Sequence, residues 1–314
     1  MNKTENSAIY SPITSALTIS YKTLSVDGLN IAYREAGEPG MPKLVLLHGW
    51  PSSSHQYRNL IPALSGRFHV IAPDYPGFGN SDAPDPSTFG YTFDKLAEVT
   101  GRFLDHVGFR RFGLYVQDYG GPVGFRLVTA TPDRLEWLIV QNTNAYEVGF
   151  TEAWAGLRYK YWVDRAQNEA TAAGLLELDV VKATYLTGSS RPELISPDNW
   201  NHDYFVTLQR KSGKQLQLDL FYDYQNNVKL YPKWQAFLKR QQPKTIIFWG
   251  QGDLFFTPAG GEAYLSDVPK AELHRLNAGH FAVEDCGEYI AQQMRRFYEE
   301  KVGAGGAVSS AQLA

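Results

Sequence analysis

The chain has 314 residues, a length at which α/β folds often build a single core around one sheet. With 43% hydrophobic and 20% charged residues, its composition is that of a globular protein and excludes disorder for the bulk of the chain. Thirty basic and 33 acidic side chains leave a net charge of −3 with no dense Lys/Arg run, so no nucleic-acid partner is expected. No segment approaches the roughly 18 apolar residues that span a bilayer, so no membrane association is expected.

The ends of the chain and its one cysteine indicate the compartment. Cys286 cannot form an internal disulfide, and residues 1–20 lack the apolar block of a signal peptide. A cytoplasmic location is therefore expected. Residues 1–20 and the Gly/Ala/Ser-rich residues 303–314 have little to bury, so both are expected to be loosely ordered tails.

Short apolar runs alternate with amphipathic stretches along most of the chain. A hairpin is predicted first, from residues 21–26 and 29–34 around an Asp-Gly turn. The later apolar runs are continuous, which is typical of parallel strands buried on both faces. The fold class is therefore predicted as α/β, with a mostly parallel central sheet flanked by helices. The predicted strands cover 43–47, 68–72, 112–116, 138–140 and 245–249, and the predicted helices cover 54–64, 93–107, 121–130 and 284–300.

The alternation stops near residue 145 and resumes near residue 244. The intervening stretch is rich in helix formers and tyrosines and contains no obvious buried strand. We therefore expect a core formed by 21–144 and 244–302, with a helical cap at 145–243. An insertion after a strand's carboxyl end lies over the crevice where such sheets bind ligands, which is the position of a lid.

The strongest chemical signal is the sequence VQDYGG at 116–121, where a predicted strand ends in Asp118 and a pair of glycines follows at 120 and 121. Glycines permit the sharp turn that lifts a side chain out of the sheet, as in a nucleophile elbow. Aspartate is also a common helix N-cap, so this motif alone leaves both interpretations open.

Residues at other predicted strand ends favour the catalytic interpretation. Trp50 follows the strand at 43–47, where its amide could bind an anion. Asp253 follows the strand at 245–249, and His280 comes after the next expected strand. Together with Asp118, these residues give the order acid, acid, base at the ends of three strands, which is improbable by coincidence.

With these motifs the chain resembles the α/β-hydrolase superfamily, whose nucleophile, acid and base follow in this order. The resemblance covers about residues 21–301 and implies an α/β-hydrolase fold with a helical cap. Most members have serine at the elbow, so Asp118 points to the branch of epoxide hydrolases and haloalkane dehalogenases, in which aspartate is the nucleophile. The matching motifs are HGWP at 48–51, PGFGNSD at 76–82, VQDYGG at 116–121, GQGD at 250–253 and GH at 279–280.

The chemistry of a carboxylate nucleophile supports that branch independently. Attack on an ester carbonyl would give a reactive anhydride, whereas attack on an sp³ carbon gives an ordinary ester, so Asp118 favours an alkyl electrophile. We expect water activated by His280 to hydrolyse that ester, while Asp253 orients the imidazole. The backbone amides of Trp50 and Tyr119 are expected to form the oxyanion hole.

This scheme requires no cofactor and no metal ion, and the remaining histidines show no ligand spacing such as HExxH. The expected partners are a small apolar organic substrate and water. The sequence leaves open whether the protein is a monomer or a homodimer.

The leaving group decides between an epoxide and a haloalkane. An epoxide oxygen needs a strong donor such as a phenol, whereas a halide needs weaker donors such as an indole N–H. Resemblance to epoxide hydrolases implies two cap tyrosines, and FYDYQNN at 221–227 resembles the stretch that carries the second, Tyr224. Tyr161 is the preferred first tyrosine and Tyr159 the alternative, although Tyr161 could equally be a packing residue.

Haloalkane dehalogenation remains the alternative. Such enzymes resemble one another in having Trp directly after the nucleophile, where this chain has Tyr119, but Trp50, Trp154 and Trp162 could supply indole N–H groups. Fluoroacetate dehalogenases carry two arginines where this chain has Tyr119 and Pro122, which disfavours a haloacid.

Epoxide hydrolysis is therefore the predicted function. A ligand-binding sensor without turnover is a third interpretation, and the complete set of Asp118, Asp253 and His280 argues against it. The resemblance also implies a cis Trp50–Pro51 bond. The predicted pocket residues are His48, Trp154, Trp162 and Phe281.

Overall fold

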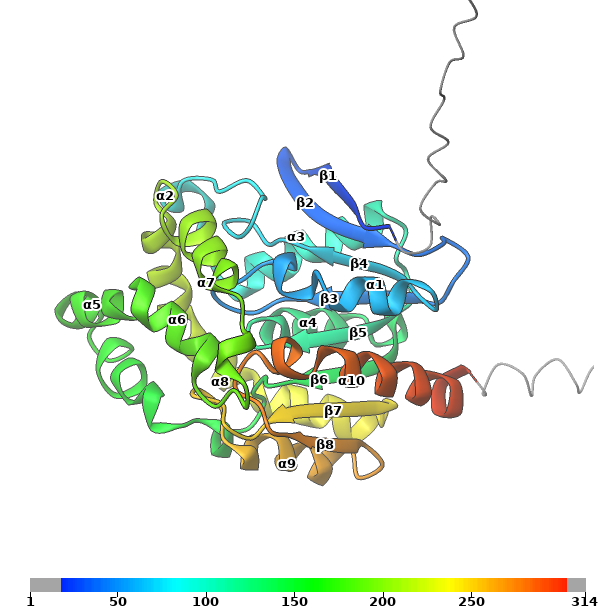
Figure 1. The fold of residues 1–314 in the computed structure, drawn as a ribbon. Coiled ribbons are helices and arrows are strands. Elements are labelled where there is room, and N and C mark those ends of the chain that lie inside the picture. Colours follow the sequence, from blue (N-terminus) through cyan, green and yellow to red (C-terminus); the bar gives the residue numbers. More distant parts are fainter. Residues whose placement is uncertain (1–17, 304–314) are drawn as a thin grey trace, which may run out of the picture.

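A computed structural model describes residues 18–303, and its centre is an eight-stranded sheet with the order β1-β2-β4-β3-β5-β6-β7-β8 (Figure 1). β1, β2 and β4 pair antiparallel, and every pairing from β4 to β8 is parallel. The predicted α/β fold is confirmed. The strands are β1 (Ser20–Val26), β2 (Leu29–Ala36), β3 (Lys43–Leu47), β4 (His69–Pro73), β5 (Phe112–Gln117), β6 (Leu135–Gln141), β7 (Thr245–Gly250) and β8 (Glu272–Leu276).

The expected tails are only partly within the described residues. Ser20 already belongs to β1, and Gly303 ends a short π-helix, η10 (Tyr298–Gly303), so both residues lie in regular structure. The rest of the expected tails, 1–17 and 304–314, lies outside the described residues.

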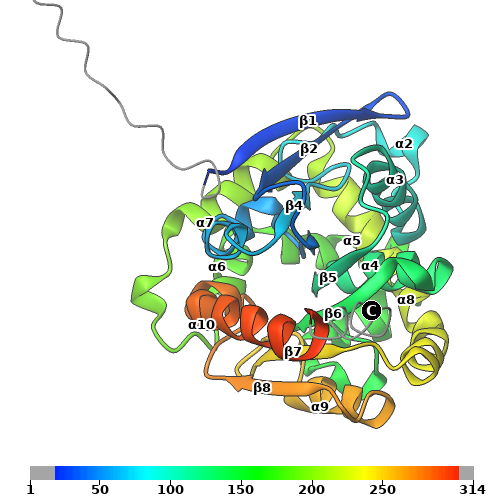
Figure 2. The same cartoon turned by 90° about the vertical axis from the view of Figure 1, so that its right-hand side faces the viewer.

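Helices cover both faces of the sheet, and Figure 2 shows α10 on one side with α3, α4 and α8 on the other. Side chains alternate along the strands because successive residues point to opposite faces. In β3, Leu44 and Leu46 pack in the same cluster as α1 and α10, whereas Val45 and Leu47 pack with α3 and α4. The helices outside the insertion are α1 (Leu60–Ser65), α2 (Pro86–Phe89), α3 (Phe93–His106), α4 (Gly120–Ala130), α9 (Pro258–Asp267) and α10 (Ala282–Phe297), with 3₁₀ turns η2 (Ser54–Tyr57) and η3 (Pro132–Arg134).

Two local expectations differ from the structure. The helix predicted at 54–64 is split into η2 and α1, because Ser53 accepts the His55 N–H to start a 3₁₀ turn and Pro62, which has no N–H, fits the first turn of a new helix. β8 is the strand expected before His280, but no apolar run predicted its bounds. It is an edge strand with a mixed sequence, ELHRL, and its side chains are mostly half-buried.

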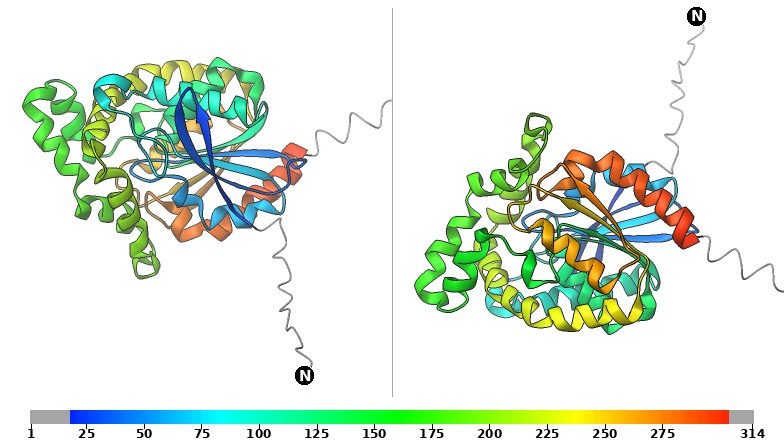
Figure 3. Two further views of the ribbon diagram at one scale, coloured as in Figure 1. Left: turned by 90° about the horizontal axis from the view of Figure 1, so that it is seen from above. Right: turned by 90° about the horizontal axis from the view of Figure 1, so that it is seen from below.

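Most of the helices formed by the chain between β6 and β7 lie beyond the carboxyl ends of the parallel strands (Figures 1 and 3). In the described part of the chain, no helix is both long and apolar enough to cross a membrane. The insertion contains η4 (Glu147–Gly149), η5 (Glu152–Trp154), η6 (Leu157–Tyr161), α5 (Arg165–Ala173), η7 (Gly174–Leu176), α6 (Leu178–Leu186), η8 (Pro192–Leu194), α7 (Pro197–Asp203), η9 (Tyr204–Leu208) and α8 (Gly213–Gln241).

The long helix α8 belongs to both parts of the molecule. Phe221, in its first half, lines the cavity described below, whereas Trp234, in its second half, stacks on Phe125 of α4 with ring centroids 5.3 Å apart. Pro232 lies inside the helix between these two contacts. The insertion is therefore not all cap, because its last turns form part of the helical layer on the core sheet.

Candidate active site

Asp118 lies on a sharp turn between β5 and α4. Its φ of +47° is in the left-handed region, which is unfavourable for most side chains. Positions 120 and 121, after Tyr119, require glycine: a Cβ on Gly120 would lie 2.2 Å from the Leu47 carbonyl oxygen, and one on Gly121 would lie 1.9 Å from Thr143 Oγ1. The turn therefore packs tightly against β3 and against the segment after β6.

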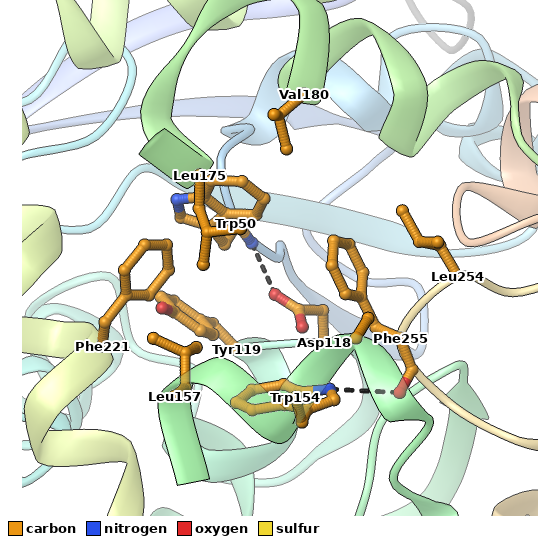
Figure 4. A pocket seen from close by; sticks show the side chains of 11 residues that line it. Trp50, Asp118, Tyr119, Trp154, Leu157, Leu175, Val180, Phe221, Leu254 and Phe255 are labelled. Atoms are coloured by element: carbon orange, nitrogen blue, oxygen red, sulfur yellow. Dashed lines mark hydrogen bonds between the residues drawn. The ribbon is translucent and has the colours of Figure 1, made fainter. Parts of the chain in front are cut away.

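The carboxylate of Asp118 has a different partner on each oxygen. Oδ1 accepts the backbone N–H of Trp50 at 2.6 Å (Figure 4), and Oδ2 lies 3.9 Å from His280 Nε2. The backbone N–H of Tyr119 also lowers the pKa of this carboxyl. The Trp50–Pro51 bond is cis, as expected.

His280 and Asp253 form a buried pair at the ends of β8 and β7. His280 Nδ1 lies 3.0 Å from Oδ2 and 3.1 Å from Oδ1 of Asp253. The carboxylate accepts two further hydrogen bonds, from Asn142 Nδ2 and the Phe255 N–H, each at 2.7 Å. Asn142, directly after β6, was not predicted as a site residue. The sequence feature that could have indicated it is a polar side chain directly after a buried strand.

Gln117 was also missed. This buried side chain directly precedes Asp118, and its Nε2 lies 3.0 Å from His280 Nε2, while its Oε1 accepts from Gln56 Nε2 at 3.5 Å. Donation by Gln117 fits a neutral imidazole that carries its hydrogen on Nδ1, toward Asp253. The available signal was an amide in an otherwise apolar strand.

Burial and charge shift both titratable groups. Burial raises the pKa of Asp118 to about 6, although the charge of His280 and the N–H groups of Trp50 and Tyr119 oppose the rise. Burial alone would lower the pKa of His280, but the carboxylates of Asp253 and Asp118 outweigh it and raise this pKa above its ordinary value. The two groups therefore titrate as a coupled pair.

Asp118 lies at the wall of an apolar cavity of about 100 Å³ between the core and the cap (Figure 4). Of the four predicted pocket residues, Trp154 lines it. The lining residues are Trp50, Asp118, Tyr119, Ala153, Trp154, Leu157, Leu175, Val180, Phe221, Leu254 and Phe255.

The other three predicted pocket residues do not line this cavity and have partners elsewhere. The ring of His48 packs on Tyr75, with centroids 4.1 Å apart, and Phe281 stacks on Tyr185 at the same distance. The indole N–H of Trp162 donates to the Phe221 carbonyl at 2.8 Å, and Trp162 does not line the cavity.

The expected cap tyrosines also do not line the cavity. The Tyr161 hydroxyl donates to the Leu218 carbonyl at 3.0 Å, and Tyr159 is 68% exposed. These residues lie in η6, a π-helix, whose wider turn changes the direction of each side chain from that expected for an α-helix. Tyr224 is fully buried and packs against Trp154, with ring centroids 4.5 Å apart, rather than lining the cavity itself.

Two polar groups of cavity-lining residues remain available. The Tyr119 hydroxyl and the Trp50 indole N–H are buried without a hydrogen-bond partner among the described residues. The Trp154 indole, by contrast, donates to the Phe255 carbonyl at 3.1 Å (Figure 4). Within residues 18–303, no three His, Cys, Asp or Glu side chains are grouped to hold a metal ion.

Comparisons with known proteins agree with this architecture. The model of the alpha/beta hydrolase fold family matches residues 42–285. An uncharacterized hydrolase of Saccharomyces cerevisiae, YNR064C, is 39% identical over 87% of this chain and 95% of its own, and a soluble epoxide hydrolase of Corynebacterium sp. is 37% identical over 89% and 94%. The crystal structure of haloalkane dehalogenase DbeA from Bradyrhizobium elkani has a TM-score of 0.73 at 22% identity, covering 90% of this chain and 99% of its own. The chain therefore belongs to the α/β-hydrolase family, in the branch that contains haloalkane dehalogenases and epoxide hydrolases.

Proposed function

We propose that this hydrolase is an epoxide hydrolase that works through an ester on Asp118. The observation that carries the proposal is a buried carboxylate facing an apolar cavity, with the Trp50 N–H on Oδ1 and His280 beside Oδ2. Oδ2 attacks a ring carbon, the C–O bond of the epoxide breaks, and the oxygen takes a proton from the Tyr119 hydroxyl, which regains one from the His280 imidazolium after the second step. Oδ1 becomes the carbonyl oxygen of the ester, already held by the Trp50 N–H.

Ester formation itself prepares the second step. The charge of Asp118 contributes to the raised pKa of His280, and this charge disappears when the carboxylate is esterified. The pKa of His280 then falls, so the imidazole loses its proton more readily and can accept one from water. The resulting hydroxide attacks the ester carbonyl, the diol leaves, and Asp118 is restored. Asp253 stabilises the imidazolium in between.

The Tyr119 hydroxyl is the donor we assign to the epoxide oxygen. It is a phenol on a cavity-lining residue and has no other hydrogen-bond partner among the described residues. A phenol can stabilise a developing alkoxide, which an indole does less well. The likeness to the soluble epoxide hydrolase of Corynebacterium over most of both chains supports the same substrate class.

Haloalkane dehalogenation is the second candidate, because the unpartnered Trp50 indole N–H could accept a halide. The indoles of Trp154 and Trp162 are less suited to that role, since each already donates to a backbone carbonyl.

Purified protein should convert styrene oxide to its diol and release no bromide from 1-bromobutane. Tyr119→Phe should slow ester formation roughly ten- to a thousand-fold, because it removes a donor needed as negative charge develops on the oxygen. Single-turnover mixing followed by product analysis measures both.

Tyr159→Phe is the matched control, since that phenol is exposed and should leave the rate unchanged. Bromide release that Trp50→Phe abolishes, together with no diol from any epoxide, would establish dehalogenation instead.

Replacement of His280 by Gln should let the ester form and then persist, because attack by Asp118 needs no base whereas hydrolysis of the ester does. Intact-protein mass spectrometry should show a gain equal to the mass of the epoxide. If the native protein consumes an epoxide and the variant never gains the mass of that epoxide, the two-step scheme is contradicted.

The rate of ester formation should fall as the pH drops through about 6, because burial raises the pKa of Asp118 to that value and only the carboxylate attacks. In His280→Gln the midpoint should move to higher pH, since the positive charge that opposes the rise is lost. A midpoint near 4 in the native protein would show an unperturbed carboxyl. Single-turnover rates between pH 4 and 8 measure both midpoints.

Asp118→Asn should stabilise the fold. A carboxyl whose pKa rises from 3.8 to about 6 on folding destabilises the native state by about 3 kcal/mol at pH 7, and the amide removes that charge. The penalty develops as pH rises from 3.8 to about 6, so the gain should vanish near pH 3.5. Asparagine also tolerates a positive φ. Urea denaturation at both pH values tests this, with exposed Asp133→Asn as the control.

A further inference from the structure

A second buried carboxylate, Asp203, lies outside the site described above. It is the last residue of α7 in the cap and is fully buried. Its Oδ1 accepts the hydroxyl of Ser52 at 3.2 Å, and its Oδ2 accepts the hydroxyl of Tyr185 in α6. Ser52 lies two residues after Trp50. A carboxylate of the cap therefore binds the core loop whose Trp50 N–H donates to Asp118.

Tyr185 extends the same contact toward His280. Its ring stacks on Phe281 with centroids 4.1 Å apart and planes at 7°, and the Phe281 ring lies 5.2 Å from that of its neighbour His280. Asp203 is thus connected on one side to the Trp50 loop and on the other to the His280 loop.

We propose that Asp203 is a positioning residue that sets the Trp50 amide and the His280 imidazole relative to Asp118 when the cap is seated. This inference rests on the proposed function, because its effect is expected on hydrolysis of the Asp118 ester, the step that uses both groups. Asp203 does not line the cavity and acts through Ser52 and Tyr185.

The surroundings of Asp203 make its charged form unfavourable, so its charge does not stabilise the fold. Burial raises the pKa of Asp203 to about 7, opposed by the hydrogen bonds from Tyr185 and Ser52. Glu284 of α10 raises the pKa further and Arg58 lowers it, but Arg58 is already paired with Glu284 at 2.8 Å.

The neighbouring imidazoles supply no counter-charge. His202 stacks on His55, with ring centroids 4.1 Å apart, and burial lowers the pKa of both, that of His55 to about 3. Arg34, which contacts His55, lowers both further. An amide at 203 would therefore fold at least as well as the carboxylate, but its single oxygen could not accept from both hydroxyls in their present positions.

The test compares Asp203→Asn with native protein in single turnover, measuring ester formation and ester hydrolysis separately. Hydrolysis should slow about tenfold to a hundredfold, as expected for small displacements of reacting groups, while ester formation changes less and thermal stability is unchanged or raised. Asp198→Asn, at an exposed position of the same helix, is the control and should match native protein. Ser52→Ala should slow the same step, and the double variant should be no slower than Asp203→Asn alone.

Native rates for both steps in Asp203→Asn would refute the positioning role, and so would an equal loss in both steps accompanied by lower stability. If Asp203→Asn does not fold, Tyr185→Phe replaces it in the test. This variant keeps the ring stacked on Phe281 and removes one hydrogen-bond donor to Asp203, and it must show the same selective slowing of ester hydrolysis. Failure of the proposed function looks different: the His280→Gln variant then forms no ester, whatever residue stands at 203.

Discussion

The rest of the site depends on keeping one carboxylate ionised in an apolar cavity. Burial of the Asp118 carboxylate is unfavourable, as its raised pKa indicates, and the surrounding structure compensates in part. The backbone N–H of Trp50 binds one oxygen, and His280 lies beside the other. Because water cannot solvate the carboxylate fully, it remains a stronger nucleophile than an exposed one. The turn that presents this carboxylate has a positive φ at Asp118 and requires glycine at 120 and 121, where a Cβ would clash with Leu47 and Thr143.

The parallel sheet makes this arrangement possible, because the carboxyl ends of its strands meet at one edge. The loop after β3 brings Trp50, β5 ends beside Asp118, and Asn142 follows β6. Asp253 follows β7 and His280 follows β8. Each group thus comes from the end of a different strand or from the loop that follows it. The hydrogen bonds of Asn142 to Asp253 and to the β7 residue Gly250 show how closely these ends are tied.

The core could be predicted from the sequence because its strands are short, apolar and buried on both faces. The site residues could be predicted because short loops keep them next to the strand ends. This logic located Asp118, Asp253 and His280 in one place. It missed Gln117 and Asn142, since an uncharged amide in a buried strand carries no pattern of its own.

The side chains of the cap that face the cavity could not be predicted in the same way. Their contacts depend on how helices pack over the core rather than on periodicity within one helix. The π-helical turn at η6 buries the Tyr161 hydroxyl against α8, and the packing of α8 sets Tyr224 against Trp154. No local sequence pattern distinguishes a tyrosine that faces a cavity from one that packs behind its wall.

The course of α8 restricts how the cap can move. One continuous helix carries Phe221 at the cavity and Trp234 on the core, so the cap is not a separate body on a flexible linker. Pro232 lacks an N–H and leaves the carbonyl of Val228 without its helical partner, which makes this turn the easiest place for the helix to bend. Substrate entry and product release would then involve bending within a helix whose second half stays packed on α4.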